Sequence, residues 1–210
     1  HYRELLVAGE YPFLIWALNT LKVAFSTAVI SVFLCALAAY SFSRFRPKGT
    51  DFIMFVLLSM RMVPAAAVIV PIFLMYTAVG WKNTYAGMIL FYAMFSIPFS
   101  VWILKGFIDG ISTRFDETAL VNGGSRFHVM FKIIFPQVKP GLVAAFVFNM
   151  IFVWNEFLFN WIVGGSRVTN IPVALSVGLY TSQGVDWTFI ASLSLVYTIP
   201  LIVAVYFFQK

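Results

Sequence analysis

Charged side chains are scarce in this sequence. Only 10% of its 210 residues are Asp, Glu, Lys or Arg, whereas soluble domains carry about 25%. Hydrophobic residues make up 61%, and the mean hydropathy is +0.92. A water-soluble core of this length cannot bury so much apolar surface, but a lipid bilayer can solvate it. The composition therefore excludes an ordinary soluble domain and predicts a membrane protein.

Cysteine and histidine are also nearly absent. Cys35 is the single cysteine, which excludes an internal disulfide and a thiolate metal cluster, and we interpret it as a small buried hydrophobe. His1 and His128 lie far apart with no other ligand-type spacing, so we predict no metal site. No Ser-His-Asp or Cys-His arrangement indicates a catalyst. The net charge of +6 is scattered along the chain, which argues against a nucleic-acid partner.

Five apolar stretches are long enough to cross a bilayer, which takes about 20 helical residues. None of them alternates with a period of two, so helices are expected rather than strands. We predict an all-α fold, a polytopic transmembrane helical bundle with five visible spans. The predicted spans are residues 13–42, 52–79, 85–104, 142–163 and 187–208.

Basic residues set the expected orientation. Most of the 14 lysines and arginines fall in residues 43–51, in residues 105–141 or at Lys210. The positive-inside rule places these segments in the cytoplasm and leaves residues 1–12 outside. No signal-peptide pattern opens the chain.

The longest predicted cytoplasmic connection, residues 105–141, begins with the pattern of a short helix. Thr113 and Asp116 have the spacing of a capping box that opens a helix to about Val121. Gly123 can end that helix, because glycine adopts the left-handed conformation at little cost.

A second short helix is expected to begin after Ser125 as its cap and to end before Pro136. Spacing of i, i+3, i+4 and i+7 predicts one apolar stripe on it. The stripe would consist of Phe127, Met130, Phe131 and Ile134. Such a segment fits either a docking element or a helix lying on the lipid surface, and the pattern alone leaves both open.

A set of residues in this connection resembles a known motif. It consists of Glu117, Thr118, Ala119, Gly123, Ile133, Phe135 and Pro136. The spacing matches the EAA loop of ABC importer permeases: Glu-Ala-Ala, three residues, Gly, nine residues, then Ile-x-Leu-Pro. Thr118 replaces the usual second Ala and Phe135 the usual Leu, whereas the Glu and the Gly are kept.

Further stretches resemble the maltose-type carbohydrate permeases within that family. They are Trp-Asn-Glu-Phe at 154–157, Pro-Gly-Leu at 140–142 and Gly-Val-Asp-Trp at 184–187. The resemblance covers essentially the whole chain and implies one transmembrane domain, residues 1–210, of the type I ABC importer permease kind. Such subunits have six spans, so a helix before His1 is expected.

The resemblance also implies partners. They are a second permease subunit, two ATPase subunits and an extracytoplasmic solute-binding protein, in the inner membrane of a bacterium or archaeon. This chain has no phosphate-binding G-x-x-x-x-G-K-[ST] loop, so ATP and Mg²⁺ are expected on the ATPases and no cofactor here. Residues expected to couple it to the ATPases are Glu117, Ala119, Gly123, Phe127, Met130, Phe131 and Pro136.

The implied solute is a sugar or a related polyol. Disaccharide, polyol, glycerol phosphate and sulfonated sugar all fit the resemblance. The outer connection, residues 163–186, is the candidate to contact the solute-binding protein, with a plain solvated loop as the alternative.

Polar residues inside predicted spans need an account, because a charge there costs about 2.5–3.5 kcal/mol on insertion scales. Arg61 falls near the expected midplane, where it either pairs with a neighbour or a backbone carbonyl, or contacts the solute or a gate. Asn149, Glu156 and Asn160 have helical spacing within about 60° of one face. These, with Trp154, Asn155, Arg61 and Lys22, are candidates for the solute pathway.

Each candidate has a structural alternative. Hydrogen bonds between helices would account for the amides and interfacial packing for Trp154, which otherwise could stack on a sugar ring. A salt bridge between Lys22 and Glu156 is a further hypothesis.

Two rival functions come from other classes. A secondary, ion-coupled transporter would need coupling carboxylates near the midplane or two related halves with broken helices. Glu156 is the single plausible intramembrane acid, and no internal repeat is clear. A membrane-embedded enzyme would need a catalytic constellation that the sequence lacks.

Overall fold

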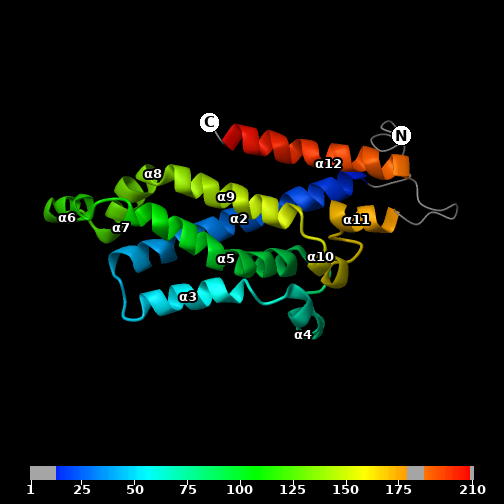
Figure 1. The fold of residues 1–210 in the computed structure, drawn as a ribbon, viewed down its shortest axis with the longest axis horizontal. Helices are drawn as coiled ribbons and strands as arrows, with labels where there is room; N and C mark the ends of the chain where they lie inside the picture. Colours follow the sequence, from blue (N-terminus) through cyan, green and yellow to red (C-terminus); the bar gives the residue numbers. More distant parts are fainter. Residues whose placement is uncertain (1–12, 179–186, 209–210) are drawn as a thin grey trace. The chain divides into compact units, whose positions relative to one another are not determined.

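The computed structural model describes residues 13–178 and 187–208 (Figure 1). All regular structure in these two ranges is helical, which confirms the predicted all-α class. The helices are α2 (Phe13–Arg44), α3 (Thr50–Met60), α4 (Ala65–Ala78), α5 (Tyr85–Asp109), α6 (Arg114–Val121), α7 (Arg126–His128), the π-helix η1 (Val129–Ile134), α8 (Phe135–Gln137), α9 (Lys139–Trp154), α10 (Leu158–Val163), α11 (Ile171–Gly178) and α12 (Trp187–Phe208).

The chain divides into two compact units, and each is described by itself below. Unit 1 comprises His1–Thr27, Ala65–Tyr92 and Met150–Lys210, and unit 2 comprises Ala28–Pro64 and Ala93–Asn149.

Three helical segments are long and apolar enough to cross a bilayer: Phe13–Arg44, Tyr85–Asp109 and Ile190–Phe207. Two bent helix pairs raise the total to as many as five, if each pair counts as one span. One pair is α3 with α4, and the other joins Arg126–Gln137 to Lys139–Trp154. The predicted stretches are helical in the described residues, but 52–79 and 142–163 are each interrupted.

Both interruptions correct the predicted continuous spans. In the stretch 52–79, α3 ends at Met60 and α4 begins at Ala65, because the residue before a proline avoids helical angles and Pro64 cannot donate a hydrogen bond. In the stretch 142–163, α9 ends at Trp154 and α10 begins at Leu158.

The connection predicted to be cytoplasmic is shorter than residues 105–141, since α5 runs on to Asp109 and α9 already begins at Lys139. The last turn of α5 is supported from two sides. Ile108 is fully buried, and Lys105 pairs with Asp109 one turn later, at 2.6 Å between Nζ and Oδ2.

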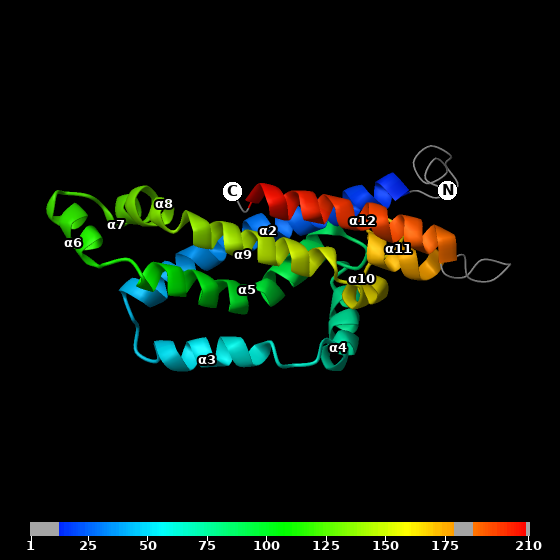
Figure 2. The same ribbon diagram turned by 45° about the horizontal axis from the view of Figure 1, so that its top comes forward.

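Unit 2 has an apolar core to which membrane helices and the cytoplasmic connection both contribute. The core residues are Cys35, Ala36, Ala39, Tyr40, Met54, Val101, Leu104, Ile108, Val129, Met130, Ile134, Val138 and Ala145. Cys35 is fully buried, as predicted, and its thiol donates to the Ile97 carbonyl at 3.7 Å. Figures 1 and 2 show α6, α7 and α8 beside one another beyond the C-terminal end of α5. The segment between α5 and α9 is therefore packed onto the helices of unit 2 and is not a loose linker.

Unit 1 is held by aromatic and apolar contacts. Phe91 stacks on Phe159 with ring centroids 3.3 Å apart, and Tyr76 packs edge-on against both. A second cluster joins Phe13, Ile171 and Leu193, which brings α2, α11 and α12 together. Along α12, most large side chains outside this cluster remain exposed, as expected of a helix that faces lipid or another chain.

A close approach fixes the turn between α4 and α5. A Cβ placed on Gly87 would lie 2.5 Å from the Trp81 carbonyl oxygen, and the Gly87 carbonyl accepts a hydrogen bond from Tyr76 at 3.0 Å. Gly106, on the same helix, has nothing within 4 Å of such a Cβ.

These two glycines give a matched test of the packing. We expect Gly87→Ala to destabilise the protein by about 1–3 kcal/mol, because backbone must shift. Gly106→Ala is expected to be neutral or more stable by up to about 1 kcal/mol, since alanine favours helix. Thermal unfolding in detergent measures both, and equal midpoints for the two variants would contradict the tight turn.

Candidate functional site

Helix α6 ends as the sequence predicts. Gly123 has a φ of 82°, in the left-handed region. Its N–H bonds the Leu120 carbonyl at 3.0 Å, and the Gly124 N–H bonds the Ala119 carbonyl at 2.9 Å. This pair of bonds is a Schellman motif. A Cβ on Gly124 would lie 2.7 Å from the Ala119 oxygen, so the turn after Glu117-Thr118-Ala119 is built for two glycines.

The predicted capping box at the start of α6 is wrong. Thr113 makes no side-chain cap hydrogen bond, and Asp116 points into unit 2 instead, with 4% of its surface exposed. Its Oδ1 accepts a hydrogen bond from the Tyr40 hydroxyl at 3.1 Å. Its Oδ2 faces the Arg44 Nε at 3.1 Å. A buried ion pair satisfies this carboxylate better than an exposed helix end would.

Arg44 is therefore the counterpart of Asp116 at the C-terminal end of α2. Both side chains are 5% exposed, and a second arm of Arg44 donates to the Ile111 carbonyl at 3.0 Å. The facing Nε and Oδ2 atoms have no hydrogen-bond partner of their own among the described residues, so each relies on the opposite charge of the other. No local pattern in the sequence predicts this pairing, because it joins residues far apart in the chain.

The second cytoplasmic helix begins as predicted but ends later. Ser125 accepts a hydrogen bond from the His128 N–H at 3.2 Å, which confirms its capping role. Helical structure then continues through Pro136 to Gln137, so the predicted end before Pro136 is wrong. The π-helix η1 precedes the proline, and the Phe135 N–H bonds the Met130 carbonyl five residues back. Such wider turns are a known way for a helix to accommodate an interruption.

The π-helix also splits the predicted apolar stripe. Met130 and Ile134 are buried in the core of unit 2, whereas Phe127 is 72% exposed and Phe131 41% exposed. Bonds that span five residues shift the side-chain phase, so spacing counted for an α-helix no longer describes one face. The prediction of a single stripe is wrong: Met130 anchors the segment, and the two phenylalanines lie outside.

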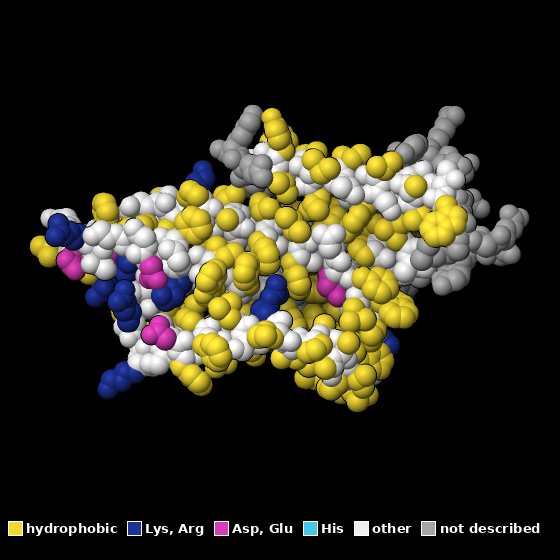
Figure 3. Space-filling model, viewed as in Figure 1, with side chains coloured by type: hydrophobic (Ala, Val, Ile, Leu, Met, Phe, Trp, Pro, Cys, Tyr) yellow, Lys and Arg dark blue, Asp and Glu magenta, His cyan; other side chains and the backbone are white. Residues whose placement is uncertain are grey.

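Exposed groups on α6 and α7 include an acid and apolar side chains. We call this surface the cytoplasmic face, after the side of the membrane that the sequence predicts for it. Glu117 is exposed, and its carboxylate makes no hydrogen bond or ion pair with the described residues. Val121, one turn after Glu117 on α6, is 88% exposed, and Phe127 on α7 is 72% exposed. Figure 3 shows most charged side chains of unit 2 gathered at the end that carries these helices. Sequence reasoning missed Val121, which no periodic pattern marks.

An apolar hollow of about 630 Å³ lies against α6. Its lining comprises Ser112, Arg114, Phe115, Thr118, Ala119 and Ile133. Ala119 and Ile133 belong to the motif described above, and both are half-buried. The small side chain of Ala119 thus helps to leave room beside Glu117.

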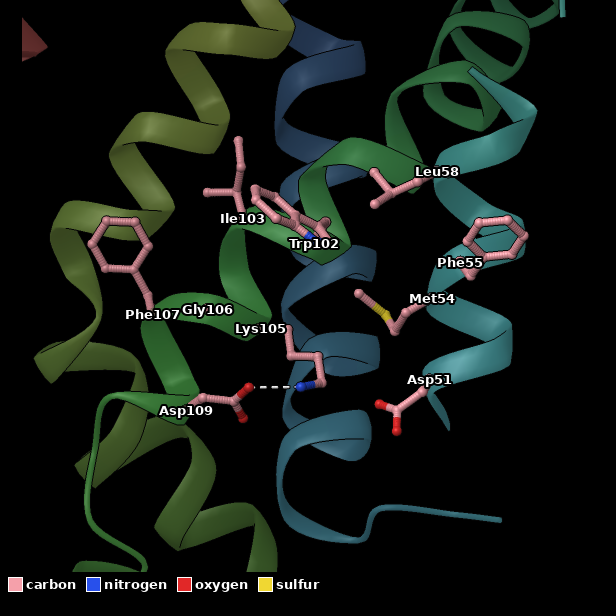
Figure 4. A pocket seen from close by; sticks show the side chains of 10 residues that line it. All are labelled: Asp51, Met54, Phe55, Leu58, Trp102, Ile103, Lys105, Gly106, Phe107 and Asp109. Carbon is pink, nitrogen blue, oxygen red and sulfur yellow. Dashed lines mark hydrogen bonds and ion pairs between the residues drawn. The ribbon is translucent and has the colours of Figure 1, made fainter. Parts of the chain in front are cut away.

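A larger hollow in unit 2, of about 740 Å³, opens between α3 and α5 (Figure 4). Apolar side chains such as Met54, Leu58 and Trp102 line most of it, and the Lys105–Asp109 pair and Asp51 lie at one end. A lining this apolar offers few hydrogen-bonding groups to the hydroxyls of a solute.

Arg61 lies at the break after α3 and not inside a continuous span. It is half-buried and donates to the Phe95 carbonyl at 3.1 Å. Its guanidinium lies 5.9 Å from the ring centroid of Phe99 and 6.0 Å from that of Phe148. This geometry fits the structural alternative, a backbone carbonyl with aromatic support.

Glu156 and Asn160 do not continue a polar stripe from Asn149, because α9 ends at Trp154. Glu156 instead holds the start of α10. Its oxygens accept from the Phe159 N–H at 2.8 Å, the Asn160 N–H at 3.3 Å and the Tyr92 hydroxyl. The one-face prediction is therefore wrong, and a carboxylate at a helix N-terminus is the physical reason for the break.

The remaining amides of this group are largely engaged. Asn160 donates to the Val168 carbonyl at 2.9 Å and accepts from the Asn170 N–H at 3.1 Å. Asn149 is buried and accepts from Ser100 at 3.1 Å. Asn155 is exposed, but bonds Ile151 and Tyr197. These contacts support the structural alternative for the amides.

Trp154 fits its structural alternative, whereas Lys22 does not make the hypothesised salt bridge. Trp154 is 2% exposed and stacks on Tyr197, so it has no free face for a sugar ring. Lys22 is exposed and lies 5.8 Å from the Tyr85 ring centroid. Because the Glu156 oxygens bond Tyr92 and backbone N–H groups, the hypothesised Lys22–Glu156 salt bridge does not form in the described part of the chain.

The start of the predicted outer connection is rigidly tied down. Asn19 donates to the carbonyls of Arg167 and Thr169 at 3.1 and 3.0 Å, and Asn83 accepts from the Arg167 N–H at 3.1 Å. Helix α11 follows, which sequence reasoning did not foresee. The predicted motif at 184–187 lies mostly outside the described residues.

Comparison with known proteins agrees with this architecture. Residues 17–210 match the family described as binding-protein-dependent transport system inner membrane component. The trehalose transport system permease protein SugB of Mycobacterium tuberculosis is 31% identical over 195 residues, which cover 92% of this chain and 71% of that protein. The trehalose/maltose transport system permease protein MalG of Thermococcus litoralis is 28% identical over 193 residues, covering 91% and 69%.

A solved structure shares the fold. It is the crystal structure of a bacterial ABC transporter involved in the import of the acidic polysaccharide alginate, with a TM-score of 0.81 and 20% identity over all of this chain and 78% of that chain. Members of the matched family are permease subunits. The chain therefore belongs to the family of binding-protein-dependent transport system inner membrane components, as a membrane-embedded permease subunit of an ABC importer.

Proposed function

We propose that this subunit forms, with a second permease, the pathway by which an ATP-driven importer takes up a saccharide. The observation that carries the proposal is the cytoplasmic face of α6 and α7, where exposed Glu117 and, one turn later, exposed Val121 lie on a firmly packed segment. Because the chain belongs to the ABC permease family, the alternative function, a secondary ion-coupled transporter, is without support.

The cytoplasmic face has the properties of a docking surface. Exposed apolar side chains as large as Phe127 are unfavourable in water unless a partner covers them. The segment Arg126–Gln137 bends by 76° from α9, so it is not a continuation of that helix. We assign Glu117 to a charge-assisted contact with a basic or backbone-donor group of an ATPase subunit.

Nucleotide chemistry is assigned to partners. A pair of ATPase subunits would bind ATP and Mg²⁺ and close on binding, and the docked α6–α8 segment would move with them. Ala119, Gly123 and Pro136 shape the segment, Met130 fixes it, and Phe127 and Phe131 supply contact area. A solute-binding protein would deliver the solute at the outer face.

The solute class rests on relatives. SugB is named for trehalose and MalG for trehalose and maltose, so we propose a neutral oligosaccharide. Because Trp154, Asn160 and Glu156 are engaged internally in this chain, contacts to the sugar would come mainly from the binding protein and the second permease.

Neutralising Glu117 should weaken docking. We expect Glu117→Gln to reduce copurification of the ATPase subunits about tenfold or more, because a charge-assisted contact is lost. Asp51→Asn is the matched control, since it also removes an exposed acid from a predicted cytoplasmic connection. Stoichiometry of the purified complex measures both, and full ATPase occupancy in Glu117→Gln would refute the assigned contact.

The solute class has its own test. In proteoliposomes with the complete complex and its binding protein, we expect trehalose or maltose to stimulate ATP hydrolysis severalfold, and methionine to have no effect. Stimulation by methionine alone would contradict the saccharide assignment and leave the docking assignment untouched.

A further inference from the structure

We propose that the ion pair between Asp116 and Arg44 makes helix α2 move together with the cytoplasmic segment, which consists of α6, α7, η1 and α8. Asp116 and Arg44 are then positioning residues for transport. This inference rests on the proposed function. It gives two neighbouring acids different roles. Exposed Glu117 contacts a partner, and buried Asp116 transmits the motion.

Helix α2 needs a side-chain link to α6, because no short stretch of backbone connects the two helices. Only four residues separate α5 from α6, and Val138 alone separates α8 from α9. Movement of the segment is therefore transmitted to α5 and α9 directly through the backbone. Helix α2 has no such connection to α6, since Tyr40 and Asp116 are 76 residues apart. Its part in unit 2 is coupled to the segment only through side chains.

The side-chain link has the geometry of a rigid joint. Asp116 receives Arg44 and Tyr40 on separate oxygens, and the second arm of Arg44 holds the Ile111 carbonyl just before α6. Three contacts from two turns of α2 therefore fix α6 in position and direction. An apolar contact alone could slide, whereas moving two buried opposite charges apart is costly.

Apolar packing supports the joint without replacing it. Tyr40 and Ala36 lie in the same core as Val129 and Met130 of η1. Arg126 also lies 5.4 Å from the ring centroid of Phe45, just after α2. These contacts keep the segment folded against α2 when the ion pair is weakened.

The test measures whether α2 and α6 move together in the assembled complex. Nitroxide labels at Ser41→Cys and Arg114→Cys, both exposed positions, in a Cys35→Ala background report the distance between the two helices by pulsed electron resonance. With the wild-type pair, we expect ATP with vanadate to change this distance by less than about 1 Å, because the helices move as one body.

In Asp116→Asn, we expect a nucleotide-dependent change of more than about 2 Å, with the ATPase subunits still bound and still hydrolysing ATP. Lys105→Gln is the matched control, since it breaks the exposed Lys105–Asp109 pair of the same unit and should behave as wild type. An unchanged distance in an Asp116→Asn complex that retains its ATPase subunits would overturn the proposal.

A milder variant covers the case in which Asp116→Asn does not assemble. Arg44→Lys keeps the charge but loses the arm to Ile111, so we expect a smaller change of the same sign, and a wild-type distance would again overturn the proposal. Absence of ATPase subunits from the wild-type complex would refute the proposed function instead, so the two failures are distinguishable.

Discussion

A buried pair of opposite charges, Asp116 and Arg44, constrains the cytoplasmic half of this protein. Either charge alone in the core of unit 2 would be strongly destabilising, so the two side chains have to stay together. That requirement fixes α6 against the end of α2. The position of the exposed Glu117, one residue later, follows from it, because the next side chain on a helix points about 100° away.

Two adjacent glycines impose a second local constraint. The left-handed turn at Gly123 and the close approach at Gly124 bring the chain from α6 directly into the Ser125 cap. The cytoplasmic segment is consequently short and well packed. A segment of this kind can carry force from a soluble partner to membrane helices, whereas a flexible loop would absorb it.

Much of this was predictable from the sequence, for physical reasons. The all-helical class, the limits of α6, the Gly123 turn and the Ser125 cap depend on local composition and backbone preference, which a sequence displays. Features that depend on distant partners were missed or wrong. Asp116 was interpreted as a cap because its partner Arg44 lies far away in the chain, and the apolar stripe failed because a π-helix changes the period.

The central claim is that the cytoplasmic face around Glu117 lies against an ATP-hydrolysing subunit. A photo-reactive benzoylphenylalanine in place of exposed Thr118, activated in native membranes, tests this most directly, with exposed Ala144 on α9 as the reference position. We predict a nucleotide-sensitive adduct to an ATPase subunit from Thr118 and none from Ala144. Adducts from Thr118 to lipid alone, in an actively transporting assembly, would contradict the claim.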